Sequence, residues 1–262
     1  MAGEKRMSGR EAPGLGTFLN GRLRVAQPHR GYRFSIDAVL LAHLAPVRRG
    51  DVVLELGTGC GIVALMLAYR HTDLRVVAVE IQPELARLAR RNVAENGLQD
   101  RIRVLNTDMR RVSREDLDER IDLVVTNPPY RPVGSGRRCA DPQRAVAREE
   151  IAVTLDQVLQ AARRVLFKTG RLAVVYPAVR TVDLLARMRH FGLEPKRLRV
   201  IHPCPGRDAQ RVLVDAVKAG RPGLEVTPPL FIHDDAGRYS PEVAAMLAGS
   251  CRQPPAGVPR QR

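Results

Sequence analysis

Glycines at alternate positions follow a continuous apolar run in the first quarter of the chain. The segment reads Leu54-Glu55-Leu56-Gly57-Thr58-Gly59-Cys60-Gly61. Glycine permits a sharp turn and lets a ligand approach the backbone at close range. The spacing differs from the G-x-G-x-x-G pattern that seats a pyrophosphate on a helix N-terminus. The turn therefore indicates a ligand site at the end of a strand, and it does not favour a dinucleotide.

Three acidic side chains accompany this turn. Glu55 lies within it, Glu80 ends the next apolar run, and Asp108 ends the third. The carboxyl ends of parallel strands meet at one edge of a sheet, so we expect these acids in one crevice. Such a crevice is unfavourable for a diphosphate and suits a cationic, phosphate-free nucleoside, which is the chemistry of S-adenosylmethionine. Glu80 stands where a carboxylate binds the ribose diol in such folds.

The fourth apolar run, IDLVVT, ends in Asn127-Pro128-Pro129-Tyr130. Two prolines fix the backbone and remove two N–H donors, which leaves nearby carbonyls free to accept hydrogen bonds. The Asn127 carboxamide and the Pro128 carbonyl can then accept both hydrogens of a planar NH₂ group, which frees the nitrogen lone pair to attack a methyl carbon. The Tyr130 ring can stack on the planar target. Orientation and electrostatics would lower the barrier without a strong general base.

These motifs resemble class I S-adenosylmethionine-dependent methyltransferases. In that family the glycine turn holds the methionine part of the cofactor, the second-strand acid holds the ribose, and the third-strand acid holds the adenine amine. The N-P-P-Y motif marks members that methylate exocyclic or amide nitrogens. The resemblance implies cofactor contacts at Glu55, Gly57, Gly59, Gly61, Glu80 and Asp108, amine acceptance at Asn127 and Pro128, and stacking at Tyr130.

Strand and helix patterns alternate around these motifs. Buried runs at 51–57, 75–80, 101–106, 121–126 and 171–177 predict parallel strands, with helices between them. A short Pro/Gly turn joins 197–203 to 210–219, which predicts an antiparallel pair. We therefore predict an α/β fold, with a doubly wound, seven-stranded, Rossmann-like methyltransferase sheet that ends in a C-terminal antiparallel hairpin.

Composition divides the chain into three segments. We predict a basic N-terminal arm or hairpin at 1–34, the methyltransferase domain at 35–219, and a C-terminal extension at 220–262. The extension holds a strand–turn–strand around 234–237 and ends in a Pro-rich stretch that we predict to be disordered. The length of 262 residues suits one compact α/β domain with modest appendages.

Several classes of protein are excluded by what the sequence lacks. No apolar run approaches the roughly 20 residues that a membrane helix needs. The first residues lack the apolar stretch of a secretory signal, so we expect a cytoplasmic protein. The four cysteines include no C-x-x-C pair, which argues against zinc and against a disulfide framework. We expect no metal.

Charge points to a polyanionic partner. Lysine and arginine number 43 against 28 acids, a net charge of +15, and such a surface attracts phosphates. The loop at 131–148 is rich in arginine, and the arm at 1–35 is rich in basic residues. Both are as expected for phosphate contacts around an extruded nucleotide. The alternative is a generic basic surface. The candidate RNA contacts are Arg33, Arg131, Arg137, Arg138 and Arg144.

A narrower resemblance covers residues 17–245. The helix entry GYRFSIDAVLL, the basic loop and the tail TPPLFIHDDAGRYSPEV are similar to the bacterial tRNA adenine-N6-methyltransferases that modify adenine 37 of valine tRNA. The resemblance implies tRNA as partner and N6 of adenine as target. The loop is richer in arginine than the family pattern. Asp37, in the helix entry, is a further candidate cofactor contact, and the other interpretation is an ordinary acid at a helix start.

Three alternatives stay open. Protein-glutamine N5-methyltransferases of release factors share the N-P-P-Y core but carry a helical N-terminal domain, whereas here only about 50 residues precede the glycine turn. An rRNA guanine-N2 or adenine-N6 methyltransferase shares both the motif and the charge. An RNA-binding protein that kept the fold and lost the chemistry would not need the intact Asn127, Tyr130 and Glu80.

Overall fold

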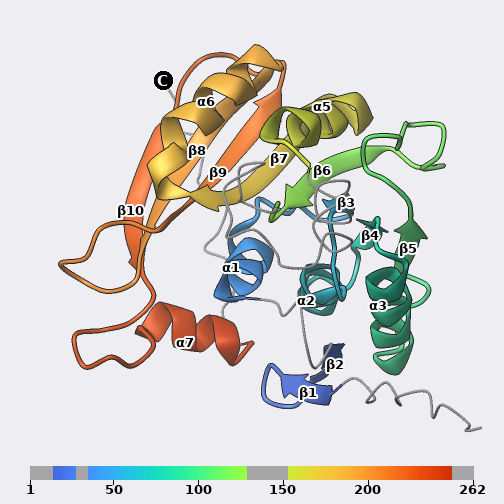
Figure 1. The fold of residues 1–262 in the computed structure, drawn as a ribbon, viewed down its shortest axis with the longest axis horizontal. Coiled ribbons are helices and arrows are strands. Elements are labelled where there is room, and N and C mark those ends of the chain that lie inside the picture. The colour runs from blue at the N-terminus through green and yellow to red at the C-terminus, as the bar shows by residue number, and fades with distance from the viewer. Residues whose placement is uncertain (1–13, 28–34, 129–152, 250–262) are drawn as a thin grey trace, which may run out of the picture.

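The computed structural model describes residues 14–27, 35–128 and 153–249, and an eight-stranded sheet forms its centre (Figure 1). The strand order is β10-β8-β9-β7-β6-β3-β4-β5. β9 pairs antiparallel with β7 and β8, and every other neighbouring pair is parallel. The strands are β3 (Val52–Leu56), β4 (Arg75–Glu80), β5 (Ile102–Asn106), β6 (Ile121–Thr126), β7 (Leu166–Pro177), β8 (Leu193–His202), β9 (Arg211–Lys218) and β10 (Glu225–Phe231).

Helices cover both faces of the sheet. In Figure 1, α1, α2 and α3 lie on one side of it and α5 and α6 lie on the other. A short 3₁₀ turn, η1, joins β7 to α6. The helices are α1 (Ile36–Leu44), α2 (Ile62–Arg70), α3 (Pro83–Glu95), α5 (Leu155–Val165), α6 (Thr181–His190) and α7 (Pro241–Leu247), and η1 spans Ala178–Arg180. None of the helices in the described ranges is long and apolar enough to cross a membrane.

The two helix layers explain why the central strands are continuous apolar runs. All five residues of β3 are buried, because successive side chains point to opposite faces and each face is covered. Val53 belongs to the hydrophobic cluster with α1, α2 and α3. Its neighbour Leu54 belongs to the cluster with α5 and α6. The strand is thus fixed from both sides, and its carboxyl end is a rigid support for the turn that follows.

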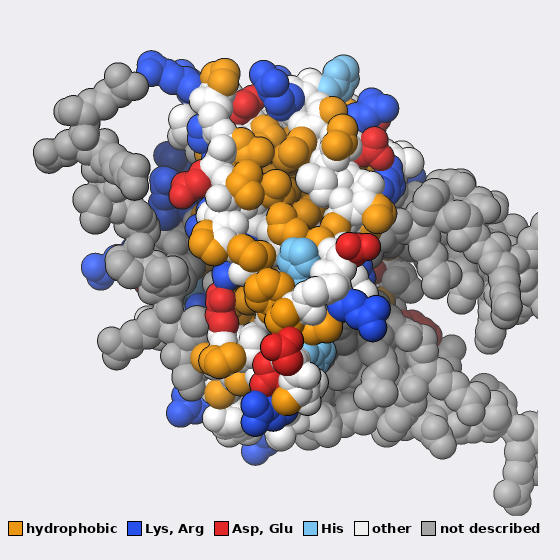
Figure 2. All heavy atoms as spheres, turned by 90° about the vertical axis from the view of Figure 1, so that its left-hand side faces the viewer, with side chains coloured by type: hydrophobic (Ala, Val, Ile, Leu, Met, Phe, Trp, Pro, Cys, Tyr) orange, Lys and Arg blue, Asp and Glu red, His pale blue; other side chains and the backbone are white. Residues whose placement is uncertain are grey.

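The predicted fold class is confirmed, and the sheet holds one strand more than the seven predicted. The additional strand, β10, lies at the edge of the sheet and contains Pro228 and Pro229. Prolines cannot donate to a ladder, and an edge strand tolerates them because its outer side needs no partner. The same prolines withhold donors from any strand that would add to this edge. Figure 2 shows hydrophobic side chains gathered on the face that includes β10.

The predicted C-terminal extension contributes to the main sheet through β10. Around residues 234–237 the structure has a turn closed by a single bridge between His233 and Tyr239, where the sequence predicts two strands. The chain then enters α7, whose first turn is capped by Ser240. The predicted disordered stretch lies from residue 250 onward, outside the described residues.

A two-stranded hairpin precedes the domain. β1 (Gly14–Phe18) and β2 (Leu23–Gln27) pair antiparallel, as the predicted hairpin requires. Asn92 on α3 attaches β2 to the domain, because its side chain exchanges two hydrogen bonds with the backbone of Ala26, at 2.8 and 2.9 Å. The same carboxamide donates to the Cys60 carbonyl at 2.8 Å. A single buried amide therefore joins the hairpin, α3 and the glycine turn.

Candidate functional site

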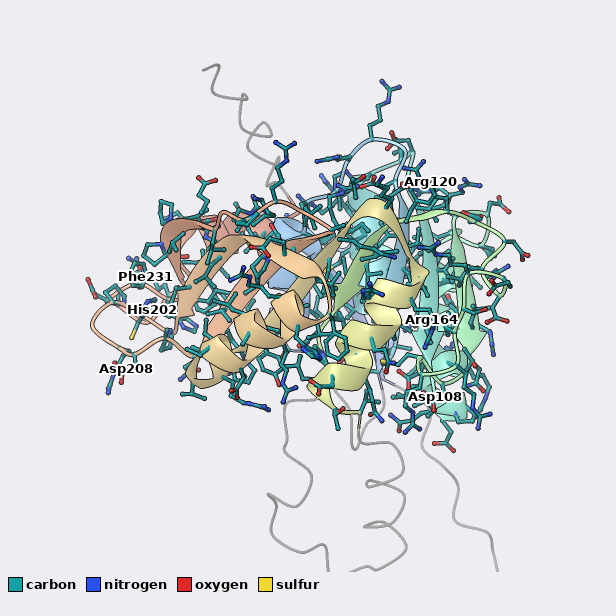
Figure 3. All side chains as sticks on the ribbon, turned by 90° about the horizontal axis from the view of Figure 1, so that it is seen from above. Asp108, Arg120, Arg164, His202, Asp208 and Phe231 are labelled. Atoms are coloured by element: carbon teal, nitrogen blue, oxygen red, sulfur yellow. The ribbon has the colours of Figure 1, made fainter. Side chains whose placement is uncertain are left out.

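The carboxyl ends of β3, β4, β5 and β6 meet at one edge of the sheet, because these strands are parallel. In Figure 3 the label of Asp108, just beyond β5, marks this carboxyl edge, and the label of Arg120, which precedes β6, marks the opposite edge of the sheet. The glycine turn and Asn127 also follow strand ends at the carboxyl edge. The topology therefore brings the glycine turn, Asp108 and Asn127 to the same edge of the sheet.

The glycine turn has a backbone conformation that residues other than glycine rarely adopt. Gly57, Gly59 and Gly61 have φ values of 77°, 59° and 90°, which lie in the left-handed region. A Cβ on Gly61 would lie 3.3 Å from the Ala89 Cβ on α3, so the helix closes that position as well. The amides of Gly57 and Thr58 both donate to the carbonyl of Val79 at 2.9 Å. β4 thus fixes the start of the turn.

Glu80 connects the end of β4 to the glycine turn. The side chain is buried, and its two oxygens accept from two backbone amides, Oε2 from Gly59 and Oε1 from Gln82, each at 2.9 Å. These two hydrogen bonds hold the carboxylate rigidly between the end of β4 and the glycine turn. Its contact with a ribose diol stays a prediction.

Glu55 points into the protein rather than along the edge. Its Oε2 accepts from the Thr58 hydroxyl at 2.6 Å and from the Ala64 amide at 3.0 Å. Burial raises the pKa of this carboxyl from 4.5 to about 7, since a charged carboxylate loses its hydration there. Glu55 therefore braces the turn and the start of α2, and its contact with the cofactor stays a prediction.

Asp108 is held by an arginine two residues along the chain. Its carboxylate accepts from the Arg110 amide and Nε, both at 2.8 Å, and forms an ion pair with Nη2 at 2.6 Å. The hydrogen bonds from Arg110 lower the pKa of Asp108 below its ordinary value. The carboxylate is therefore ionised at neutral pH and available as an acceptor for an amine.

The start of the N-P-P-Y motif lies beside the glycine turn. Thr126 and Leu56 are register partners on β6 and β3, and the Thr126 hydroxyl donates to the Leu56 carbonyl at 3.0 Å. The next residues, Asn127 and Gly57, therefore leave the sheet as neighbours. Asn127 is half-buried and Pro128 is buried. The sites predicted at Tyr130, Arg33, Arg131, Arg137, Arg138 and Arg144 lie outside the described residues.

Asp37 forms an ion pair that the sequence did not reveal. Its Oδ2 lies 3.1 Å from Nε of Arg211, and the carboxylate is almost fully buried. Arg211 begins β9 opposite Pro177, the last residue of β7, so the pair lies at the carboxyl edge. The two residues are 174 positions apart, and no local pattern could have joined them. A contact between Asp37 and the cofactor stays a prediction.

Within the described residues, no group of three or more histidine, cysteine, aspartate or glutamate side chains could hold a metal ion. Cys60 and Cys204 are free thiols. Burial raises the pKa of Cys60 to about 12, so this thiol stays protonated and does not act as a nucleophile.

Residues 35–190 match the family model of the methyltransferase small domain. The chain belongs to the methyltransferase small domain family. As a methyltransferase of this family it uses S-adenosylmethionine, and the prediction of an S-adenosylmethionine-dependent methyltransferase is confirmed. The glycine turn fits the cofactor, since a Cβ at Gly57 would fill the space between the backbone and Met109, whose Cε would lie 3.7 Å from it. It lies among carboxylates, which suit a cationic nucleoside.

Similar proteins agree with this assignment. A protein of Porphyromonas gingivalis named tRNA1(Val) (adenine(37)-N6)-methyltransferase is 36% identical over 84% of this chain and 89% of its own length. A protein of the same name from Trichodesmium erythraeum is 31% identical over 85% and 92%. The crystal structure of a predicted O-methyltransferase from Agrobacterium tumefaciens matches with a TM-score of 0.65 and 26% identity, over 82% of this chain and 96% of that one.

Proposed function

We propose that this methyltransferase transfers a methyl group from S-adenosylmethionine to N6 of an adenine in tRNA, with adenine 37 of valine tRNA as its target. The observation that carries the chemistry is the position of Asn127 beside the glycine turn, fixed by the Thr126–Leu56 hydrogen bond of 3.0 Å. The relatives named for tRNA1(Val) adenine-37 methylation support the choice of substrate.

The chain's own residues orient the two reactants. Glu80 binds the ribose hydroxyls, Asp108 accepts from the adenine amine of the cofactor, and the glycine turn accommodates the methionine part. When bound, S-adenosylmethionine supplies an electrophilic methyl group on a positively charged sulfur. The Asn127 side-chain oxygen and the Pro128 carbonyl accept the two hydrogens of the target amine, so that its lone pair faces the methyl carbon.

Asn127 and Pro128 make a strong base unnecessary. Their two acceptors favour the geometry in which the target nitrogen is nearly tetrahedral. After transfer the nitrogen is cationic and acidic, so it releases its proton to water. Tyr130 stacks on the target adenine and keeps its amine in line. The rate therefore depends on preorganised acceptors rather than on a titrating group of the protein.

Basic residues supply the RNA contacts. We assign Arg33, Arg131, Arg137, Arg138 and Arg144 to phosphates on either side of an extruded adenine, and the net charge of +15 supports this assignment. The proposed divisions at residues 34 and 219 set off a basic arm and a C-terminal extension, and the extension adds β10 to the sheet of the methyltransferase domain. A tRNA-modifying activity implies a cytoplasmic location.

Radiolabelled cofactor distinguishes the substrate classes. The protein is incubated in parallel with bulk tRNA, rRNA, DNA and release factors, and incorporated label is counted for each. We expect label in tRNA. Label in release factors alone would establish the protein-glutamine alternative, and label in rRNA alone would establish the ribosomal one. Absence of label everywhere, with intact RNA binding, would establish the non-catalytic alternative.

The target base is tested on transcripts of valine tRNA. Nucleosides released after the reaction are separated by mass spectrometry, and we expect N6-methyladenosine. A matched transcript with guanine in place of adenine 37 should accept no methyl group. Equal methylation of both transcripts would contradict the proposed position.

A further inference from the structure

Arg164 makes three hydrogen bonds to a segment that is distant in sequence. It lies in the last turn of α5, and its guanidinium donates to the carbonyls of Val112, Met109 and Arg110 at 2.8, 3.1 and 2.9 Å. These carbonyls belong to the loop after β5. One planar cation thus fixes three points, within four residues, of a backbone that lies outside the strands of the described sheet.

The segment that Arg164 holds lies beside the glycine turn. Asp108 precedes it directly, and Met109 is buried with its Cε 3.7 Å from the place where a Cβ on Gly57 would stand. Arg110, whose carbonyl Arg164 holds, is also the residue that pairs with Asp108. Figure 3 shows Arg164 and Asp108 in the same part of the molecule. The backbone that Arg164 fixes therefore determines where the Asp108 carboxylate points.

α5 is a rigid support for this guanidinium. A complete capping box between Thr154 and Gln157 begins the helix, which satisfies two amides that would otherwise lack partners. Val158, Leu159 and Ala162 are fully buried against the sheet. Arg164 projects from the part-buried side of the helix. The loop residues whose carbonyls it contacts are 52 to 55 positions away in the sequence.

We infer that Arg164 is a positioning residue for the cofactor: it fixes the loop after β5 so that Asp108 faces the adenine amine. Arg164 does not touch the cofactor and acts through the Met109, Arg110 and Val112 carbonyls. The inference rests on the proposed assignment of Asp108 to the adenine. Without Arg164 the loop after β5 is no longer held in place. The protein should then discriminate less between ligands that carry the adenine amine and ligands that lack it.

Two ligands that differ only at the adenine edge test this inference. Calorimetry gives the affinity of the full-length protein for S-adenosylhomocysteine and for its purine riboside analogue, which has a hydrogen in place of the amine and keeps N1 as an acceptor. The wild type should prefer the adenosyl compound by at least about tenfold, because Asp108 is an acceptor and the hydrogen on C6 cannot donate to it. Arg164→Ala should reduce this preference to about threefold or less.

A matched control is the neighbouring residue. Arg163 is exposed on the same helix, so Arg163→Ala removes the same charge without touching the loop carbonyls, and the preference should stay at its wild-type value. Arg164→Lys keeps the charge without the planar fork, and we expect an intermediate preference. This variant keeps the test valid if Arg164→Ala unfolds.

The outcomes separate three accounts. A lowered melting temperature with an unchanged ligand preference in both Arg164 variants would show a purely structural role and overturn the inference. If the wild type binds the two ligands equally well, Asp108 does not contact the adenine amine. This result would also overturn the inference. The RNA methylation assay does not depend on this ratio, so methylation of tRNA in that case would leave the proposed function standing.

Discussion

Thr126 donates its hydroxyl hydrogen to the carbonyl of Leu56 across two parallel strands, at 3.0 Å. The two residues are also register partners in the sheet. This double connection fixes the relative position of the segments that begin immediately afterwards, the glycine turn at Gly57 and the motif that begins at Asn127. The proposed cofactor and target sites are therefore adjacent because two strands end together.

The first prediction concerns Glu80. Glu80→Gln should weaken S-adenosylhomocysteine binding by about 10- to 100-fold, because hydrogen bonds from the ribose diol to a charged acceptor contribute roughly 1.5–3 kcal/mol each. Calorimetry measures the affinity. The control is Glu95→Gln at the end of α3, where the carboxylate forms a loose ion pair with Arg91 at 3.8 Å. If the wild type and Glu80→Gln have equal affinity, Glu80 does not bind the ribose hydroxyls.

The second prediction follows from the raised pKa of Glu55. Its folded-state value of about 7 exceeds the ordinary 4.5, so the folded protein holds this proton where the unfolded chain has released it. The stabilisation is fully present below pH 4.5 and is lost as pH rises through 7, a change of about 3 kcal/mol.

Glu55→Gln removes this titration and keeps an oxygen that can accept from Thr58 and Ala64. The difference in unfolding free energy, variant minus wild type, should therefore increase between pH 4.5 and 7.5. Titrations of other groups, such as Asp215, whose pKa burial also raises, are common to both proteins and cancel. Denaturant unfolding at several pH values measures this difference, and a constant difference would show that Glu55 titrates normally.

The third prediction concerns the ion pair between Asp37 and Arg211. Arg211→Met should destabilise the protein by about 1–3 kcal/mol, because it leaves the buried Asp37 carboxylate without its pairing cation. The double variant Asp37→Asn with Arg211→Met should be more stable than the two single effects added together predict. Denaturant unfolding of all four proteins gives the coupling energy. Strict additivity would show that the pair contributes nothing.

The fourth prediction concerns RNA binding. Logarithmic plots of the RNA affinity against salt concentration should have a steep negative slope, since phosphate contacts release counterions. Replacing Arg137 and Arg138 by alanine should reduce the magnitude of the slope by about 2, one for each lost contact. The charge-matched control replaces Arg49 and Arg221, two exposed arginines elsewhere on the chain. Equal slopes for the two double variants would assign the phosphate contacts elsewhere.

Local sequence patterns predicted most strands of the sheet, but they did not place β10 at its edge. The runs that became β3, β4 and β6 are mostly apolar because helices cover both faces, and such runs are visible in sequence. β10 reads EVTPPLF, and its two prolines indicate a loop unless its edge position is known. Pairing order is a property of the whole sheet, so no local window could supply it.

In the candidate site, too, local patterns revealed some residues and missed one whose partners are distant in sequence. The glycine turn, Glu80, Asp108 and Asn127 were found because their spacing along the chain reflects successive strand ends. Arg164 was missed because its partners are more than fifty residues away and are backbone carbonyls, which any residue type provides. Arginines are too common in this chain for one of them to stand out.

The most direct test of the central claim is the turnover of Asn127→Ala on valine tRNA, measured together with its affinity for S-adenosylhomocysteine. Loss of the carboxamide acceptor should reduce methyl transfer by about 100-fold or more, since a preorganised acceptor acts mainly in the transition state. The cofactor affinity and melting temperature should stay close to wild type, with the affinity within about tenfold. Methyl transfer at the wild-type rate by this variant would contradict the account.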